Sequence, residues 1–160
     1  MGRWKLFGSI VGLGLAADQA SKLYIDNTMT LYRSIPVLDG LFNITYLRNK
    51  GAAFSFLSDA AWRIPFFLVV TLVAIVAILV ALRRVRDDQR LAQVALAMVF
   101  AGAVGNLIDR VRLGEVIDFL DVYWKNYHWP AFNVADSLIC VGVALVAFDM
   151  LREERRPAGR

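Results

Sequence analysis

Carboxylate and amide side chains recur in three short stretches of an otherwise apolar sequence. Asp109 and Arg110 close one apolar run, Asp118 lies in the stretch that follows, and Asp136 begins another apolar run. Two aspartates held close together cannot both ionise, so one keeps its proton near neutral pH. The ionised aspartate can then deprotonate a water while the protonated one polarises a carbonyl, which is peptide hydrolysis without a cofactor. Spacing alone leaves open which two of the four aspartates pair. The candidate polar residues are Asn106, Asp109, Asp118, Asp121, Asn133 and Asp136.

Other hydrolytic chemistries lack the residues that they need. The only histidine, His128, lies among aromatic residues with no matching serine motif. The only cysteine, Cys140, is about a helical turn inside an apolar run, where we expect it in the core. The ligands of a zinc site and a glycine-rich phosphate loop are both missing, so the sequence predicts neither a metal nor a nucleotide cofactor.

Two alternatives to a pair of aspartates remain open at this point. A serine–lysine peptidase would use Lys22 with Ser21 or Ser55. It needs a neutral lysine, whereas Asp18 lies one helical turn from Lys22 and favours the charged form. A small proton-coupled carrier would use acids within the membrane, but the two halves of the sequence show no repeat and the acids do not fall at mid-span.

The composition indicates an integral membrane protein. Of the 160 residues 58% are hydrophobic and 20% are charged, and the mean hydropathy is +0.52. A soluble domain usually has about 45–50% apolar and about 25% charged residues. Four apolar runs match the roughly 20 residues that a spanning helix uses. We therefore expect one membrane domain over residues 1–160, an all-α fold of four transmembrane helices. The predicted spans are residues 6–25, 64–82, 91–108 and 134–151.

Basic residues predict the orientation of these spans. Three short segments, residues 1–5, 83–90 and 152–160, hold ten of the 18 lysines and arginines. The positive-inside rule places all three in the cytoplasm, so both termini are inside. Arg3 and Lys5 before an apolar stretch also resemble a secretory signal, and we expect an uncleaved first span instead. The net charge of +4 reflects this anchoring to the membrane, and we do not expect nucleic-acid binding. The ten residues are Arg3, Lys5, Arg83, Arg84, Arg86, Arg90, Arg152, Arg155, Arg156 and Arg160.

Two segments are left for the extracytoplasmic side. Within residues 26–63, apolar and polar side chains alternate in the stretch 41–47, and an Asp39-Gly40 turn signal separates it from the stretch 34–38. This pattern predicts a small β-hairpin or sheet on the membrane surface. Residues 109–132 are expected to form a second interfacial loop or helix. Their aromatic side chains are typical of an interfacial belt, with an aromatic ligand cage as the alternative. These side chains are Tyr123, Trp124, Tyr127 and Trp129.

Five short motifs in this order resemble those of a known family. Asp18-Gln19 with Lys22 comes first, and the others read NKGAAFS, GNLIDR, VIDF and FNVAD at residues 49–55, 105–110, 116–119 and 132–136. Together they resemble the lipoprotein signal peptidase (signal peptidase II) family of bacteria, membrane aspartic peptidases, from about residue 6 to residue 151. The family often has two glycines where this chain has Ala101-Gly102.

The resemblance implies an enzyme of the bacterial inner (cytoplasmic) membrane with its active site near the periplasmic face. Such an enzyme cuts diacylglyceryl-modified prolipoproteins just before the lipidated cysteine, contacts membrane lipids and is inhibited by globomycin. It uses no cofactor and no metal. Motif by motif, the catalytic pair falls on Asp118 and Asp136. The positions that line the site fall on Asn49, Asn106, Arg110 and Asn133, and supporting positions on Asp18, Lys22 and Asp109, which leaves Asp121 as a bystander.

Overall fold

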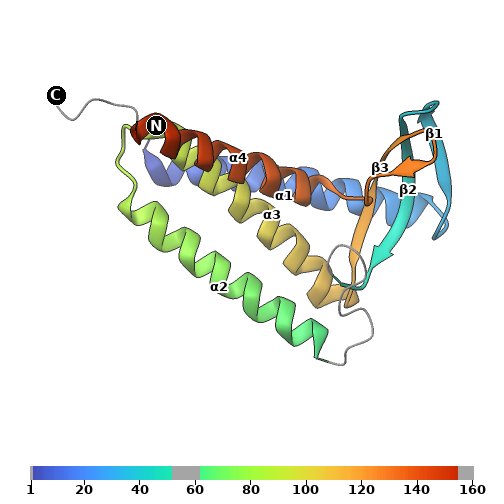
Figure 1. The fold of residues 1–160 in the computed structure, drawn as a ribbon. Coiled ribbons are helices and arrows are strands. Elements are labelled where there is room, and N and C mark those ends of the chain that lie inside the picture. The colour runs from blue at the N-terminus through green and yellow to red at the C-terminus, as the bar shows by residue number, and fades with distance from the viewer. Residues whose placement is uncertain (1, 52–61, 155–160) are drawn as a thin grey trace.

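Four helices and a small antiparallel sheet make up the computed structural model, which describes residues 2–51 and 62–154 (Figure 1). The sheet covers one end of the helix bundle, here called the sheet end. The first turn of α1, the last turn of α4 and the turn between α2 and α3 lie at the other end, here called the terminal end. The helices are α1 (Arg3–Thr28), α2 (Arg63–Arg84), α3 (Arg90–Leu113) and α4 (Val134–Glu154). The strands are β1 (Ser34–Leu38), β2 (Phe42–Asn49), β3 (Val116–Trp124) and β4 (Tyr127–His128).

Three of these helices, α2, α3 and α4, are long and apolar enough to cross a membrane. They confirm the runs predicted at residues 64–82, 91–108 and 134–151, although α3 continues to Leu113 before Gly114 ends it in a left-handed conformation with φ of +70°. The first predicted run lies within α1, which has 26 residues. Asp18 and Lys22 make α1 more polar than the other three helices, and both side chains are buried against the rest of the bundle.

Small residues bring α3 and α4 into close contact. A Cβ atom added at Gly102 would collide with the carbonyl oxygen of Ala135, and one added at Gly142 would lie 2.8 Å from the carbonyl oxygen of Ala95. The methyl group of Ala101, where the family often has glycine, faces Gly14 of α1. In contrast, α2 diverges from α1 and α4 toward the sheet end (Figure 1). The helices therefore approach most closely where α3 meets α4 and α1.

The sheet has the order β1-β2-β3-β4 with antiparallel neighbours. The hairpin predicted for residues 34–47 is confirmed, with Gly40 at its turn in a left-handed conformation, φ of +79°. The prediction of a loop or helix for residues 109–132 is wrong over residues 116–124, which form β3 along the edge of β2. Residues 116–119 are all buried, so this half of β3 has a polar residue, Asp118, among buried neighbours instead of the regular alternation that identifies a strand.

A cluster of hydrophobic side chains holds the sheet against α1. Tyr46 of β2 packs with Ile25 of α1 and with Ile117 and Phe119 of β3. The Tyr46 hydroxyl also donates a hydrogen bond to the Asp26 carboxylate, and Arg48 pairs with the same oxygen at 2.9 Å. The sheet is thus held in one position over the helix ends, which fixes where the side chains of β3 point.

Candidate active site

Asp118 and Asp136 come from different elements and meet in one polar cluster at the sheet end. Asp118 lies on β3, and its two carboxylate oxygens accept hydrogen bonds from the side-chain amides of Asn133 at 2.8 Å and Asn49 at 3.0 Å. Asp136 lies in the first turn of α4 and accepts a hydrogen bond from the amide of Asn106 at 2.7 Å. Asn133 is bonded to both aspartates, so one asparagine connects the pair.

The start of α4 explains the position of Asp136. Asn133 precedes the helix, and its side-chain oxygen accepts the backbone N–H of Asp136 at 2.9 Å. The Asp136 carboxylate in turn accepts the backbone N–H of Asn133 at 3.2 Å. These reciprocal bonds have the geometry of a capping box, with aspartate in the place of the usual glutamate. The helix end therefore orients Asp136 through local backbone contacts.

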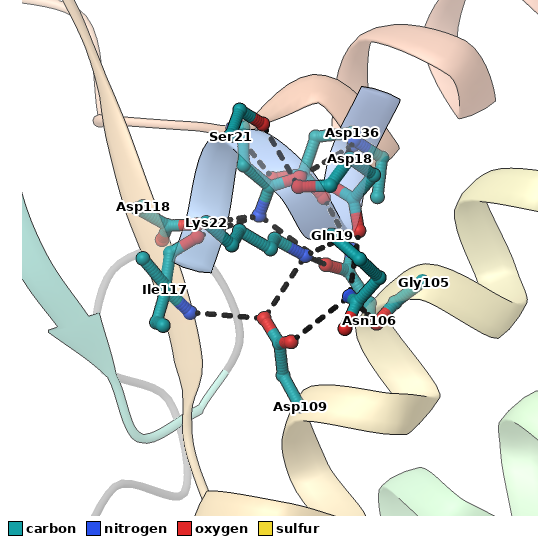
Figure 2. A network of polar contacts seen from close by, with 12 residues as sticks. Asp18, Gln19, Ser21, Lys22, Gly105, Asn106, Asp109, Ile117, Asp118 and Asp136 are labelled. Carbon is teal, nitrogen blue, oxygen red and sulfur yellow. Dashed lines mark hydrogen bonds and ion pairs between the residues drawn. The ribbon is translucent and has the colours of Figure 1, made fainter. Parts of the chain in front are cut away.

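Behind the pair lies a buried ionic cluster formed by Asp18, Lys22 and Asp109 (Figure 2). The Lys22 ammonium lies 3.0 Å from Asp18 and 2.9 Å from Asp109, and the exposed fractions of all three side chains are 2% or less. Backbone N–H groups of Ala135 and Ile117 donate to the two carboxylates at 2.9 and 3.2 Å. The cluster therefore joins α1 and α3 to the first turn of α4 and the first residues of β3.

Gln19 completes this cluster and was not assigned a role from the sequence. Its amide nitrogen donates to Asp18 at 3.0 Å, to Asp109 at 3.2 Å and to the carbonyl oxygen of Gly105 at 3.3 Å. The Asp18-Gln19 pair within the first motif is the signal that could have identified it. A glutamine next to an aspartate is common in any helix, and only its contacts reveal what it does.

Two cavities meet at Asp136, one of the two aspartates. The larger one, about 400 Å³, lies under the sheet and is lined by both aspartates and by aromatic residues of the segment after β3. The second, about 290 Å³, lies between α2, α3 and α4 and has mostly apolar walls, including Val70, Ala74 and Ile139. Both cavities contact the same three polar residues, Asn106, Arg110 and Asp136. The remaining polar and aromatic residues of the larger cavity are Asn49, Asp118, Tyr127, Trp129 and Phe132.

Arg110 is the cation that faces the cavities. Its guanidinium carbon lies 4.9 Å from the centre of the Phe67 ring, and its Nη1 donates to the carbonyl oxygen of Asn106 at 3.4 Å. A guanidinium placed on an aromatic ring is held by its face and keeps donors available for other partners. Arg110 can therefore bind a carbonyl or a negatively charged group within the cavity.

Burial dominates the electrostatics of Asp118, which is 3% exposed. Burial first and the nearby charge of Asp136 second raise the pKa of Asp118 to about 7, and the hydrogen bonds from Asn49 and Asn133 only partly oppose them. A carboxyl group of this pKa exchanges its proton near neutral pH. The cluster thus has the property expected of one half of an acid–base pair.

The structure brings together all six predicted lining and pair residues, Asn49, Asn106, Arg110, Asp118, Asn133 and Asp136, in the larger cavity or against it. Asp18, Lys22 and Asp109 lie directly behind them. The alternative serine–lysine chemistry is not supported, because Lys22 is ion-paired with two carboxylates and the Ser21 hydroxyl donates to the carbonyl oxygen of Asp18. Ser55 lies outside the described residues.

The sequence predicts that Asp121 is a bystander to the site and that Cys140 lies in the core. Asp121 lines neither of these two cavities, yet it links three strands by accepting bonds from Asn43 at 3.1 Å and Thr45 at 3.2 Å and by contacting His128 at 2.8 Å. Burial tends to raise the pKa of Asp121, but the hydrogen bonds from His128 and Asn43 outweigh it and lower the pKa. Cys140, expected in the core, is exposed and lines the larger cavity, one turn after Asp136 on the same face of α4.

Comparison with known proteins gives a consistent result. The model of a protein family described as "Signal peptidase (SPase) II" matches residues 10–152. The chain is 68% identical over 155 residues to the lipoprotein signal peptidase of Geobacter sulfurreducens, covering 97% of each chain. It is 46% identical over 153 residues to that of Syntrophotalea carbinolica, covering 96% of this chain and 95% of the relative.

Two solved structures described as bacterial membrane enzymes have the same fold. The first superposes with a TM-score of 0.87 at 33% identity, covering 96% of this chain and 92% of the other. The second superposes with a TM-score of 0.80 at 35% identity, covering 91% and 92%. The helices, the sheet and their arrangement thus recur in membrane enzymes with about a third of their residues in common.

Proposed function

Because the chain belongs to the signal peptidase II family, the aspartic peptidases that process prolipoproteins, we propose that Asp118 and Asp136 are its catalytic pair. The observation that carries this proposal is that the two aspartates share Asn133 and line one cavity. They are the only aspartates among the residues that line it. Two other buried carboxylates, Asp18 and Asp109, are both paired with Lys22, and a third, Asp121, is not among the residues that line the cavity.

The proposed reaction uses one ionised and one protonated carboxyl group. The ionised aspartate removes a proton from a water, whose oxygen attacks the scissile carbonyl carbon, while the protonated aspartate donates its proton to the carbonyl oxygen. The product of this step is a gem-diol. A proton then passes to the peptide nitrogen, the C–N bond breaks, and a carboxylic acid and an amine leave. No step requires a metal or a nucleotide.

The neighbouring polar residues position the peptide in this proposal. Arg110 and Asn106 face both cavities and can bind carbonyl oxygens on either side of the scissile bond. Holding the reacting groups in one geometry supplies a large part of the rate acceleration in such a reaction. Asn49 and Asn133 each donate a hydrogen bond to Asp118, and we propose that these two bonds hold its carboxyl group in place at the site.

A lipid-modified prolipoprotein is the substrate class that fits this site. The apolar cavity beside α2 can hold acyl chains of a diacylglyceryl group, and the larger cavity can hold the peptide next to it. The cleaved bond is then the one just before the lipidated cysteine. Globomycin is expected to occupy the larger cavity and to contact the aspartate pair.

The proposed location is the bacterial inner membrane, with both termini in the cytoplasm and the aspartate pair near the periplasmic face. The support is the distribution of charge along the bundle. Arg83, Arg84, Arg86 and Arg90 lie at the terminal end around the α2–α3 turn, opposite the aspartate pair. The positive-inside rule places such a cluster in the cytoplasm.

A gel-shift cleavage assay on a diacylglyceryl-modified prolipoprotein tests the proposal. Asp118→Asn and Asp136→Asn should each lower kcat by at least about 10³-fold, since each removes one partner of the acid–base pair. Asp39→Asn, at the exposed hairpin turn, is the matched control and should cleave normally. Near-normal cleavage by a folded Asp118→Asn or Asp136→Asn protein contradicts the catalytic pair. Equal cleavage of a non-lipidated substrate contradicts the proposed substrate class.

A further inference from the structure

Asn106 lies between the buried ionic cluster and the aspartate pair (Figure 2). Its side-chain oxygen accepts hydrogen bonds from the Lys22 ammonium at 2.9 Å and from the Asn133 amide at 3.2 Å. Its side-chain nitrogen donates to Asp136 at 2.7 Å. Lys22, Asn106 and Asp136 therefore form a chain of two hydrogen bonds from a buried cation to one of the two aspartates.

The direction of this chain is determined by chemistry. An ammonium group has three donors and no acceptor, so only the oxygen of Asn106 can face Lys22. The amide nitrogen of Asn106 must then face Asp136, and the Asp136 oxygen that meets it must be an acceptor. With an apolar side chain at position 22, the oxygen of Asn106 would keep the Asn133 amide at 3.2 Å and lose the shorter, charged contact at 2.9 Å that holds it in this orientation.

The same chain stabilises negative charge on Asp136. A donor that is itself bonded to a cation is polarised, and hydrogen bonds in such chains strengthen one another. Asp136 accepts a second bond from the backbone N–H of Asn133 at 3.2 Å. Both oxygens of Asp136 are thus acceptors, as are both oxygens of Asp118, so the two aspartates differ in which of their donors is bonded to a cation.

Asp118 has a different environment. Its donors are the amides of Asn49 and Asn133, and the oxygen of Asn49 accepts a backbone N–H from Gly51 at 2.9 Å instead of a cation. The Asn133 nitrogen has two hydrogens for three acceptors, since it also faces Asn106 and the carbonyl oxygen of Ile117, both at 3.2 Å. The hydrogen bonds of Asp118 therefore stabilise a negative charge less than those of Asp136 do. This agrees with the pKa of Asp118, about 7, which is raised mainly by burial and next by the charge of Asp136.

We propose that Lys22 is a positioning residue that determines, through Asn106, which aspartate is ionised, so that Asp136 is the base and Asp118 holds the shared proton. The inference rests on the catalytic pair proposed above. Among the described residues, the charged groups around the pair, Asp118 of β3 and Asp136 of α4, are Lys22 and Asp18 from α1 and Asp109 and Arg110 from α3. Asp18 and Asp109 hold the ammonium of Lys22 at the oxygen of Asn106, and Arg110 lines both cavities together with Asp136.

The test measures the dependence of kcat and KM on pH for Lys22→Met, using a diacylglyceryl-modified prolipoprotein. Methionine has nearly the length of lysine but no donor. We expect kcat to fall about 10- to 100-fold, the range for losing a charge-assisted hydrogen bond at a buried group, with KM changed less than about threefold. The acidic limb of the kcat profile should move to higher pH by about one unit, because the base now loses its proton less readily.

Asp109→Asn is the matched control within the ionic cluster. It removes one carboxylate from Lys22 and leaves the Lys22–Asn106 bond, so the acidic limb should stay in place or move to lower pH. A second control is a double-mutant cycle with Asn106→Ala. If Lys22 acts through Asn106, then Lys22→Met should add no further loss of kcat in the Asn106→Ala background.

Several outcomes overturn the inference. They are an unshifted acidic limb in folded Lys22→Met protein, a shift of the same size in Asp109→Asn, and additive losses in the cycle. If Lys22→Met does not fold, the double variant Lys22→Met with Asp109→Asn replaces it. In this variant positions 18, 22 and 109 together keep their net charge of −1. The acidic limb should again move to higher pH by about one unit. Failure of the catalytic pair itself is recognised separately, by activity that survives Asp118→Asn or Asp136→Asn.

Discussion

The two ends of the bundle contain ion pairs of the same length in opposite surroundings. At the sheet end, Lys22 lies 3.0 Å from Asp18, and the two side chains are 2% and 0% exposed. At the terminal end, Arg3 lies 3.0 Å from Asp87, and these side chains are 20% and 79% exposed. Water can solvate either partner of the exposed pair when the other is removed, but it does not reach the buried pair. The same distance therefore corresponds to different energies.

The difference also separates two tasks. Arg3 donates to the carbonyl oxygens of Leu82 and Arg83, both at 3.0 Å, and so closes the last turn of α2. That contact concerns only helix packing. The buried cluster instead lies next to the aspartate pair, where each charge affects the protonation of its neighbours. Charge at the sheet end is costly to bury and carries the proposed chemistry, whereas charge at the terminal end anchors and caps helices.

The largest expected difference in the free energy of unfolding is between replacing the buried aspartate and replacing the exposed aspartate by alanine. Asp18→Ala leaves a backbone N–H of Ala135 without its acceptor and removes one of the two carboxylates that balance Lys22. We expect it to lower the free energy of unfolding by about 3–5 kcal/mol, and Asp87→Ala to lower it by less than about 1 kcal/mol. Thermal unfolding of the detergent-solubilised proteins measures both. Equal losses would show that burial does not distinguish the two ends.

The space around the buried carboxylate gives the next test. A Cβ atom added at Gly105 would lie 2.5 Å from an oxygen of Asp18, whereas one added at Gly12 meets no atom within 4 Å. Gly105→Ala should therefore destabilise the protein by about 1–3 kcal/mol and reduce activity, because it pushes Asp18 away from Lys22. Gly12→Ala is the matched control and should be neutral or slightly stabilising. Wild-type unfolding of Gly105→Ala protein would contradict the close packing at the sheet end.

The pH dependence of the sheet end follows from Asp118. Burial, and next the charge of Asp136, raise its pKa from 3.8 to about 7. If protonated Asp118 donates to the scissile carbonyl, kcat should fall about tenfold per pH unit above about 7. The folded protein also retains a proton that the unfolded chain releases near 3.8, so this group makes the free energy of unfolding decrease as the pH rises from about 4 to about 7. A rate that stays constant through neutral and alkaline pH would exclude Asp118 as the acid.

The smallest effect is expected for the terminal end by itself. Arg3→Ala removes the exposed ion pair and two bonds to carbonyl oxygens of α2, and we expect a loss of about 1 kcal/mol with unchanged kcat. Arg3→Lys keeps the charge and should recover part of the stability. High salt should reduce the contribution of Arg3–Asp87 and leave that of Lys22–Asp18 nearly unchanged, since exposed charges are screened and buried ones are not. A large loss of kcat in Arg3→Ala would mean that the two ends are coupled.

Much of the fold could be predicted because its signals are local. The apolar runs of α2, α3 and α4, the Gly40 turn and the basic residues at the helix ends are each readable within about 20 residues. Strand β3 could not be predicted because its signal is not local. Its identity depends on pairing with β2, about 70 residues earlier in the chain, as in the contact of Ile117 with Arg48. Its buried first half carries no regular alternation.

The sequence by itself determined the membrane class, the helical runs and, through five ordered motifs, the family and the residues of the candidate site. Only the tertiary structure decided which polar groups are bonded to which. Lys22 and Asn106 are 84 positions apart, and Ala135 and Asp18 are 117 positions apart, yet each pair forms one hydrogen bond. Hydrogen bonds act over about 3 Å, and the free energy of a charge depends on whether water reaches it. Both conditions arise only when α1, α3, α4 and β3 pack together, which is why the direction of the Lys22–Asn106–Asp136 chain could not be read from the sequence.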